Sequence, residues 1–554
     1  MSLKGDLQKY KPRKEQQEAL SFIDSEWQKN KLNKFFLLNL PTGVGKSVLA
    51  LMIADWYKKN VNRTSRVDII TSNRILQEQY SQSFESISDL KGKNNYECQS
   101  YSCSCAQGSE FNRLNKTSCE SCPYTQARDG YMSGGISLTN FYLYILYAIY
   151  NPKLMEVRGA KVLIVDECHA FDDIISDFIS IKITEVIVKK FKFSNEYEII
   201  KNLKSVSSIS QYVDFLKFFN SEIISTIEDM EKGMSGTSRT IKSDKRDLKI
   251  SKVLKTKNSD VRIMNLISDL KQYQLKIDVF LKEYKVNSNN WILESNWNEK
   301  SKQKELSLEP IWAYDYLDKY VFSNYDMVFL MSGTILDKNL FCQLNGLDVD
   351  KSIYYSIGSP FPSRNRPIYY MPLGKMSFKN KEETFKTYIP YIKKILDKYK
   401  GKKGIIHTNS FELAKWIENS IKDPRLVFHD SSNKEEILKM HMESEEPTVI
   451  VSPSMNVGVS FDNDSARFQI IAKIPYPTLI SQKNKMRMSN NPDWYSWRTC
   501  TDLQQSFGRI IRSDLDYGDT IILDGSFGDL MRHSSKFLVD WVQDSIKTIA
   551  VKQY

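Results

Sequence analysis

The segment PTGVGKS at residues 41–47 constrains this chain more than any other feature. The apolar run FFLLNL at residues 35–40 precedes it, and a helix-like pattern follows it. Strand, glycine-rich loop and helix in this order form a phosphate-binding turn, because loop N–H groups and the helix dipole both attract an anion. The strict pattern of such a loop has glycine where Leu40 stands. The order still predicts that Lys46 reaches the β- and γ-phosphates of ATP and that Ser47 binds Mg²⁺.

Two carboxylates follow a second apolar run, VLIV at residues 162–165. Such a run is typical of a central strand, and ligands of open α/β sheets bind at the carboxyl ends of the strands. Asp166 is therefore expected to hold the Mg²⁺ shell, and Glu167 to orient or deprotonate the attacking water.

Short β-branched runs alternate with helix-like patterns on both sides of a long middle segment. That middle segment, from about residue 171 to 308, instead shows helical apolar spacing and few strand signals. The whole pattern predicts an α/β fold with two parallel sheets, the first of them interrupted. The strand signals lie at residues 35–40, 67–71, 162–165, 327–331, 404–407, 448–451, 470–474 and 520–523.

Composition limits the class of protein. The 554 residues carry 78 Lys+Arg against 67 Asp+Glu, a net charge of +11, with 41% hydrophobic residues. These values exclude a wholly disordered chain and a small disulfide scaffold. The most apolar stretch, residues 141–150, is far shorter than the roughly 20 residues that span a bilayer, and residues 1–17 do not resemble a signal peptide. We expect a cytoplasmic protein with no membrane partner and a charge that suits a polyanion.

Five of the eight cysteines lie close together in the sequence. In a reducing compartment, such a cluster favours metal binding over disulfides. Four thiolates suit either an iron–sulfur cluster or structural zinc, and the spacing alone does not choose between them. The five are Cys98, Cys103, Cys105, Cys119 and Cys122.

With these motifs in order, the chain resembles superfamily 2 helicases, and more specifically the XPD/DinG family of iron–sulfur DNA helicases. The resemblance covers most of the chain outside the middle segment. Arg13 and Gln16 resemble the adenine-side Gln motif of that family. The other matching segments are motif Ia at 71–79, the stretch before motif II at 136–141, motif II at 166–169 with Cys168 for the usual alanine, motif III at 332–334, signatures at 358–362 and 474–477, motif V at 458–462 and motif VI at 505–512.

The resemblance implies two RecA-like parallel-sheet motor domains, the first interrupted by a small Cys-rich metal domain and by a mostly helical Arch-like domain. We expect the first motor domain at residues 1–90, 131–170 and 309–340, and the second at 341–554. The Cys-rich domain would occupy residues 91–130 and the Arch-like insertion 171–308.

The family places a [4Fe–4S] cluster on four cysteines that end in Cys-Pro-Tyr, as Cys122 does here. The resemblance therefore favours iron–sulfur, with zinc as the alternative. Cys98, Cys119 and Cys122 are expected ligands, and Cys105 is preferred to Cys103 as the fourth.

Further roles follow from the motifs. An arginine finger stabilises the charge of phosphoryl transfer, and Arg509 and Arg512 have the helical spacing to face a nucleotide together. Gln505 joins them as a catalytic residue, and Ser332, Thr334 and Gly458 would couple the two domains. Nucleic-acid contacts are expected from Thr71, Arg74, Thr139 and Asn140. The expected ATP and Mg²⁺ site comprises Arg13, Gln16, Thr42, Gly43, Val44, Gly45, Lys46, Ser47, Asp166 and Asp462.

The resemblance implies an ATP-dependent helicase that moves 5′→3′ along single-stranded DNA and opens tailed or forked duplexes. We expect it to act as a monomer. One alternative is a nucleic-acid-stimulated translocase that remodels protein–DNA complexes, or acts on RNA, without productive unwinding. A second is a non-catalytic binding protein with a degenerate ATPase, which the intact Lys46, Asp166, Glu167 and Gln505 oppose.

Overall fold

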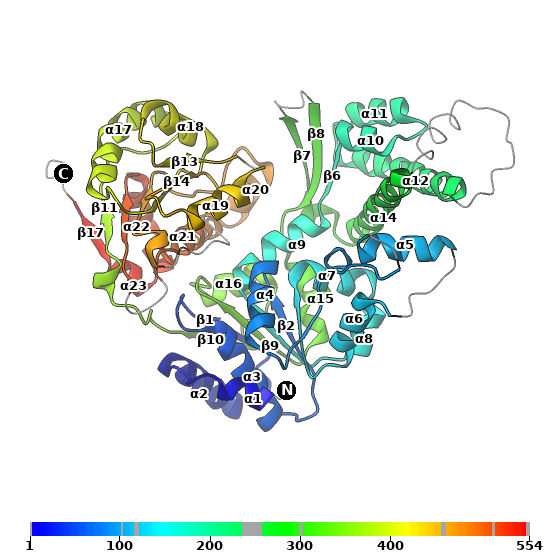
Figure 1. Ribbon diagram of the computed structural model, residues 1–554, viewed down its shortest axis with the longest axis horizontal. Coiled ribbons are helices and arrows are strands. Elements are labelled where there is room, and N and C mark those ends of the chain that lie inside the picture. The colour runs from blue at the N-terminus through cyan, green and yellow to red at the C-terminus, as the bar shows by residue number, and fades with distance from the viewer. Residues whose placement is uncertain are drawn as a thin grey trace.

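The chain folds into three lobes (Figure 1). A computed structural model describes residues 3–100, 103–115, 121–234, 257–298, 303–430, 432–455, 461, 463–511 and 516–549. In Figure 1 the first sheet lies at the bottom, the second sheet at the upper left and a helical insertion at the upper right. Four of the expected site residues lie outside the described residues, namely Cys119, Gly458, Asp462 and Arg512.

The first lobe is a seven-stranded sheet in which all the pairs are parallel. Its central strands are buried on both faces, which explains why they read as unbroken apolar runs in the sequence. The strand order is β10 (Ser352–Ser356), β1 (Phe35–Asn39), β9 (Met327–Ser332), β5 (Val162–Asp166), β2 (Val67–Thr71), β4 (Ile136–Asn140) and β3 (Ser88–Asp89).

Two helices of this lobe, α1 and α2, precede the first strand, and the others lie between strands along the chain. α3 is buried along most of its length, so its sequence shows little amphipathic pattern. The helices of the first lobe are α1 (Leu3–Gln8), α2 (Lys14–Lys29), α3 (Lys46–Asn60), α4 (Arg74–Ser83), α7 (Phe141–Tyr150), α8 (Pro152–Arg158), α15 (Tyr314–Tyr320) and α16 (Lys338–Asn345).

The first sheet extends further along the sequence than expected. β10 pairs with β1 from Phe35↔Ser352 to Asn39↔Ser356, so residues 352–356 belong to this sheet. The sequence placed the end of the first motor domain at residue 340, because the run SIYYS carries no clear alternation or apolar signal of its own. Pairing with β1, a tertiary contact, assigns this strand to the first sheet.

The second lobe repeats the same plan with another seven-stranded parallel sheet. The strand order is β13 (Leu426–Phe428), β14 (Val449–Ser452), β12 (Gly404–His407), β15 (Phe468–Ile471), β16 (Asp519–Ile522), β11 (Ile368–Tyr370) and β17 (Ile546–Thr548). Its helices are α17 (Lys381–Lys398), α18 (Phe411–Ser420), α19 (Lys434–Glu443), α20 (Gln482–Asn490), α21 (Pro492–Phe507), α22 (Ser526–Ser534) and α23 (Asp540–Gln543).

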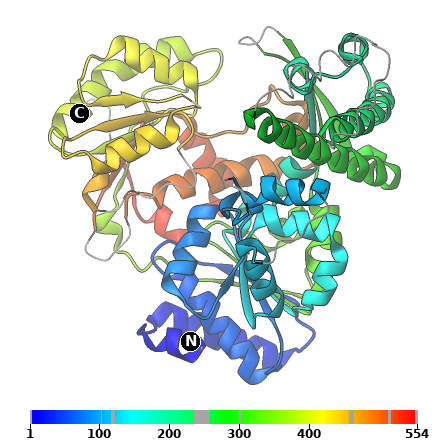
Figure 2. The same cartoon turned by 45° about the vertical axis from the view of Figure 1, so that its right-hand side comes forward.

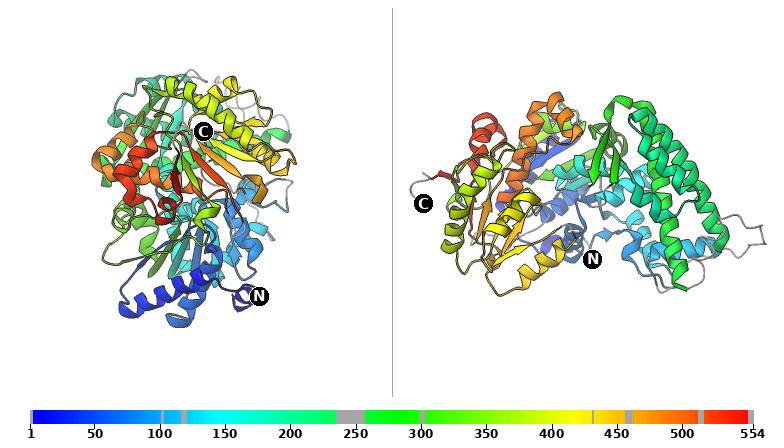
Figure 3. Two further views of the ribbon diagram at one scale, coloured as in Figure 1. Left: turned by 90° about the vertical axis from the view of Figure 1, so that its left-hand side faces the viewer. Right: turned by 90° about the horizontal axis from the view of Figure 1, so that it is seen from above.

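The insertion lobe, from α9 to β8, combines helices with a small antiparallel sheet of order β6–β8–β7 that the sequence did not predict. The long helices α12 and α14 pack along each other (Figure 3, right). Its elements are α9 (Phe171–Ile179), β6 (Ile181–Thr184), α10 (Glu185–Phe191), α11 (Glu196–Ser205), α12 (Ile209–Met234), α14 (Lys257–Val286), β7 (Trp291–Asn298) and β8 (Gln303–Pro310).

The Cys-rich segment, residues 91–130, contributes α5 (Cys105–Asn115) and the start of α6 (Pro123–Ser133). α5 packs against α14 of the insertion lobe. Arg113 of α5 pairs with Glu231 of α12 at 2.5 Å, and Lys271 of α14 pairs with Glu110 of α5 at 3.1 Å. The Cys-rich segment and the insertion lobe therefore lie side by side (Figure 1).

Helices α20 and α21 connect the second lobe to the rest of the molecule (Figure 2). Arg487 of α20 is 3% exposed and donates to both carboxylate oxygens of Asp172 at the start of α9. Trp497 of α21 donates its indole N–H to the Ile335 carbonyl in the first lobe at 3.0 Å. A buried, bidentate ion pair with the insertion lobe and an indole hydrogen bond to the first lobe thus hold this face of the second lobe in place.

Candidate active site

Strand register brings the site together at one edge of the first sheet. Asn39 pairs with Ser332, Asp166 pairs with Met331, and Thr71 pairs with both Asp166 and Asn140. The carboxyl ends of the central strands therefore end level with one another. The phosphate loop, the two carboxylates and the segments after β2, β4 and β9 meet there because all the strands are parallel.

The phosphate loop adopts a backbone shape that requires glycine. Gly43 and Gly45 have φ angles of +95° and +79°, in the left-handed region that glycine tolerates best. α3 begins at Lys46, directly after the loop. Its N-terminal N–H groups and its dipole thus point to the place where phosphate oxygens would bind.

Arg13 and Gln16, at the start of α2, contact the loop from behind. Arg13 donates to the Gly43 carbonyl, and the Gln16 amide donates to the carbonyls of Val44 and Gly45 at 2.9 and 3.0 Å. Gln16 is 2% exposed. Both side chains occupy loop carbonyls, which leaves the loop N–H groups for an anion.

Lys46 and the two carboxylates form a compact charged group. Lys46 Nζ lies 3.2 Å from Glu167 Oε1, and Glu167 itself has a left-handed φ of 61°. Burial would raise the pKa of Glu167, but Lys46 and His169 more than offset it and hold that pKa well below its ordinary value. Glu167 is consequently an ionised acceptor, as a group that orients or deprotonates water must be.

Asp166 is more deeply buried than Glu167 and accepts a side-chain hydrogen bond. The Tyr80 hydroxyl donates to Asp166 Oδ2 at 2.9 Å. Burial raises the pKa of Asp166 to about 6, although Lys46 opposes the shift. Asp166 Oδ1 is buried and has no hydrogen-bond partner among the described residues. A buried, unpaired carboxylate oxygen beside a phosphate loop fits a Mg²⁺ ion, which prefers oxygen ligands.

A chain of hydrogen bonds leads from this group into the second lobe. His169 Nδ1 lies 2.9 Å from Ser332 Oγ, and Ser332 Oγ lies 3.2 Å from Thr334 Oγ1. Gln505 of α21 then donates its amide to Thr334 Oγ1 at 3.0 Å. Two of the expected coupling residues, Ser332 and Thr334, therefore connect motif II with an expected catalytic residue of the other domain.

The end of α21 also approaches the phosphate loop. A Cβ atom at Gly508 would lie 3.1 Å from Thr42 Oγ1, so only glycine allows this approach without displacement. Arg509 follows at once and is 8% exposed. The structure therefore brings the start of motif VI to the site.

Four residues around the site escaped the sequence analysis as separate candidates: Tyr80, His169, Phe361 and Arg366. The Phe361 ring occupies the space where a Cβ atom of Gly43 would lie. Arg366 donates to Ser359 Oγ at 2.6 Å and to the Phe361 carbonyl at 2.7 Å, and it stacks on Trp541. Arg366 lines one cavity with Thr42 and Gln505, and burial lowers its pKa to about 10. The signature at 358–362 marked this segment, but burial of the following arginine leaves no mark in one sequence.

The expected nucleic-acid residues differ in exposure. Arg74 exposes 62% of its side chain and pairs with Glu78. Thr71 and Thr139 are buried, and their hydroxyls donate to the carbonyls of Asn73 and Leu90. Asn140 accepts from Leu143 N and thereby caps α7. In this conformation Arg74 offers its side chain to a ligand, whereas Thr71 and Thr139 would need their backbone to do so.

Sulfur atoms of the Cys-rich segment approach one another. Cys105 Sγ lies 3.3 Å from Cys122 Sγ, and Cys98 N donates to the Cys103 carbonyl at 2.9 Å. Burial would raise the pKa of Cys122, but the Thr125 N–H and the Cys105 thiol lower it overall. Among the described residues, no group of three or more His, Cys, Asp or Glu side chains forms a metal site. The thiol donors that are described suit a soft metal, and the expected ligand Cys119 is not among them.

Comparisons with known proteins agree with this geometry. The family model of a helicase C-terminal domain matches residues 392–545, and the model described as type III restriction enzyme, res subunit, matches residues 9–202. A Methanocaldococcus jannaschii protein described as a probable ATP-dependent helicase is 22% identical over 313 residues, which cover 51% of this chain and 44% of that protein. The matched part thus spans less than half of that relative's length.

Solved structures of similar fold cover the chain more fully. An XPD helicase structure superposes with a TM-score of 0.63 at 14% identity and covers 97% of this chain and 100% of that one. The S. tokodaii Xpd4 structure has a TM-score of 0.57 at 13% identity, with coverage of 97% and 100%. At these identities the likeness establishes the fold.

Two RecA-like domains, a phosphate loop in the first and a match of the second to the helicase C-terminal domain model are features of the ATP-dependent helicases of superfamily 2. The overall fold is that of the XPD helicase structures. No helix in the described part of the chain is long and apolar enough to cross a membrane.

Proposed function

We propose that the chain hydrolyses ATP between its two sheets, and that it uses this hydrolysis to move 5′→3′ along single-stranded DNA and to open a tailed or forked duplex. The observation that carries the proposal is the path of hydrogen bonds from His169 through Ser332 and Thr334 to Gln505. Such a path links the site of Asp166 and Glu167 to the second domain. Closure of the cleft between the domains and hydrolysis of ATP would therefore be coupled.

Ser47 and Asp166 would hold Mg²⁺, which neutralises phosphate oxygens when bound. Lys46 binds the β- and γ-phosphates, and Glu167 accepts a proton from the attacking water. Gln505 and Arg509 of the second lobe would stabilise the charge of the transferred phosphoryl group, and Arg512 is proposed to share this role. Asp462 and Gly458 are proposed to complete the site from the same lobe.

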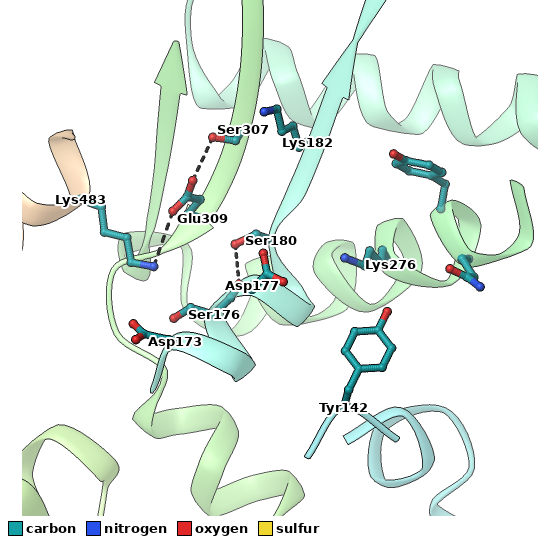
Figure 4. A pocket seen from close by; sticks show the side chains of 12 residues that line it. Tyr142, Asp173, Ser176, Asp177, Ser180, Lys182, Lys276, Ser307, Glu309 and Lys483 are labelled. Carbon is teal, nitrogen blue, oxygen red and sulfur yellow. Dashed lines mark hydrogen bonds and ion pairs between the residues drawn. The ribbon is translucent and has the colours of Figure 1, made fainter. Parts of the chain in front are cut away.

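A second cavity supports the proposed path of the single strand. It lies where α7, α9, α14, the insertion sheet and α20 meet, and Figure 4 shows lysines of β6, α14 and α20 around it. Lys276 offers charge for a phosphate, Lys182 and Lys483 could exchange their partners Glu305 and Glu309 for one, and Tyr142 and Tyr273 offer rings on which bases stack. Together with Arg74 and Asn140 at the edge of the first sheet, these groups would guide one strand past the insertion lobe.

We also propose that Cys98, Cys105, Cys119 and Cys122 hold a [4Fe–4S] cluster. The proximity of Cys105 and Cys122 supports this choice of Cys105 over Cys103. Zinc is the alternative, and iron and zinc analysis of anaerobically purified protein distinguishes the two metals. A rigid metal-bound segment packed on α14 would serve as the wedge where strands part.

Strand separation with ATP and Mg²⁺ tests the proposal as a whole. The substrates are matched duplexes with a 5′ or a 3′ single-stranded DNA tail, a third duplex with an RNA tail, and Lys46→Ala serves as the inactive control. We expect opening from the 5′ DNA tail alone. DNA-stimulated ATPase without opening of any duplex would favour a translocase that remodels protein–DNA complexes, and opening from the RNA tail alone would favour an RNA substrate.

A further inference from the structure

Helix α4 lies between the residues expected to contact nucleic acid and the carboxylates of Asp166 and Glu167. Its first residue, Arg74, is exposed at the edge of the sheet, and Tyr80 lies six residues further along the helix, about 9 Å at 1.5 Å per residue. Gln77 lies midway. At intervals of three residues these side chains occupy neighbouring positions around the helix. α4 thus reaches from solvent to the buried acid Asp166.

The inner end of this helix holds Asp166. Tyr80 is 0% exposed, packs its ring near Phe84 at a centroid distance of 6.0 Å, and donates its hydroxyl to Asp166 Oδ2. Asp166 Oδ1 keeps no partner among the described residues. One hydrogen bond therefore selects which oxygen of the carboxylate is left for Mg²⁺, in the way that outer partners orient metal ligands.

The middle of the helix is tied to Asn140. Gln77 is 0% exposed, and its amide nitrogen donates to Asp89 Oδ1 at 2.5 Å and to the Leu90 carbonyl at 2.9 Å. Its amide oxygen accepts from Asn140 Nδ2 at 2.9 Å. A displacement of Asn140 by a bound strand would therefore act on α4 through a hydrogen bond, and not only through packing.

We infer that Tyr80 is a positioning residue: its hydroxyl sets the rotation of the Asp166 carboxylate toward Mg²⁺, and α4 conveys to that carboxylate whether nucleic acid is bound at Arg74 and Asn140. This inference rests on the proposed function. It assigns to the first domain alone a route between strand binding and hydrolysis, separate from the route through Gln505 to the second domain.

The test is Tyr80→Phe, which keeps the buried ring and removes the hydroxyl. Tyr388→Phe is the matched control, because Tyr388 is also 0% exposed and its hydroxyl has no hydrogen-bond partner among the described residues. ATP hydrolysis is measured with and without a single-stranded oligothymidylate, across Mg²⁺ concentrations. Binding of the oligothymidylate and of a non-hydrolysable fluorescent ATP analogue is measured in parallel.

For Tyr80→Phe we expect the Mg²⁺ concentration that half-saturates analogue binding to rise about tenfold, and the stimulation by oligothymidylate to fall by about the same factor. Oligothymidylate affinity should stay within about twofold, because the hydroxyl touches no nucleic-acid group. A role in packing alone would lower thermal stability and leave Mg²⁺ dependence and stimulation as in Tyr388→Phe, and that result would overturn the inference.

Wild-type controls separate the inference from the function on which it rests. A wild-type chain that shows no stimulation by oligothymidylate overturns both, whereas normal stimulation in Tyr80→Phe overturns the inference alone. Should Tyr80→Phe not fold, hydrogen exchange of the wild-type chain decides. Exchange in α4 should slow when the Mg²⁺–nucleotide analogue is added, and unchanged exchange would overturn the inference.

Discussion

The two seven-stranded sheets share one architecture but differ in what their strand ends do. In the second sheet, polar side chains on the central strands bond one another: His407 Nε2 lies 3.2 Å from Gln469 Oε1, and Gln469 donates to Thr520 Oγ1 at 2.7 Å. In the first sheet, Asp166 Oδ1 at the end of a central strand has no partner among the described residues. The first sheet thus keeps a hydrogen-bond acceptor available for a ligand. In the second sheet, the polar groups of the central strands are used in hydrogen bonds that stabilise the sheet itself.

The comparison also shows how a non-catalytic sheet contributes to a site. The second lobe reaches the phosphate loop through the end of α21, where Gln505 contacts Thr334 and Gly508 approaches Thr42. Because α21 belongs to the second domain, Gln505 and Gly508 move away from the phosphate loop when that domain moves away. This arrangement therefore suits a cycle in which ATP hydrolysis depends on closure of the two domains.

The largest effect should come from the first sheet. Glu167→Gln removes the ionised acceptor, so we expect the ATPase kcat to fall by about 10²–10⁴-fold, with folding and DNA binding retained. Lys46→Ala should abolish hydrolysis. Glu412→Gln in the second lobe removes an equally charged group that is 50% exposed and pairs with Lys381, and steady-state ATPase assays should show no change. Full activity of Glu167→Gln would refute the site.

The adjacent residues Gln504 and Gln505 sharpen the comparison within one helix. Gln504 donates to the Phe537 carbonyl and accepts from Val539 N, so Gln504→Ala should cost about 1–3 kcal/mol of stability. Gln505→Ala should instead lower kcat about tenfold, which corresponds to about 1.4 kcal/mol, and leave the melting temperature unchanged. Melting curves and ATPase assays of both variants check this contrast, and a reversed pattern would show that Gln505 is structural.

The Cys-rich segment, for which a metal is proposed, can be compared with the two sheets. Cys122→Ser should lose the bound metal and duplex opening together, while DNA-stimulated ATPase persists, because the phosphate loop does not depend on that segment. Cys500→Ser, at a buried cysteine of α21, is the control that keeps the metal. Metal analysis, visible absorbance and strand-separation assays give the result. Normal metal content in Cys122→Ser would exclude this residue as a ligand.

The smallest expected effect is the dependence of the second lobe's stability on pH. Burial lowers the pKa of His441 to about 4, and neutral His441 bonds the Ser465 carbonyl and the Thr448 hydroxyl. Its ordinary pKa is about 6.5, so its stabilising contribution is complete above that pH and is lost as the pH falls toward 4, because the unfolded chain binds the proton first.

When the pH falls from 7.5 to 5.5, His441 should lower the free energy of unfolding of the second lobe by about 1.4 kcal/mol. Hydrogen exchange of α19, corrected for its intrinsic pH dependence, measures the change. The variant His441→Asn carries no titrating group there and should lose less stability over the same interval. Equal losses in both proteins would contradict the assignment.

Much of the fold could be predicted because its determinants are local. The apolar runs at 67–71 and 404–407 coincide with β2 and β12, and the run at 162–165 is extended only by Asp166 in β5. The shorter or more polar strands β10 and β3 gave no such signal. They form because neighbouring strands supply hydrogen-bond partners, a contribution that no periodicity records.

The candidate site divides in the same way. The sequence by itself determined the phosphate loop and the two acids after the apolar run at 162–165, since glycine spacing, a charge and a buried run are properties of neighbouring residues. Only the tertiary structure decided that Tyr80 holds Asp166, that Gln505 meets Thr334, and that the Thr71 hydroxyl is already bonded. These facts depend on side chains far apart in the chain, whose meeting is settled by strand register and by how the two lobes pack.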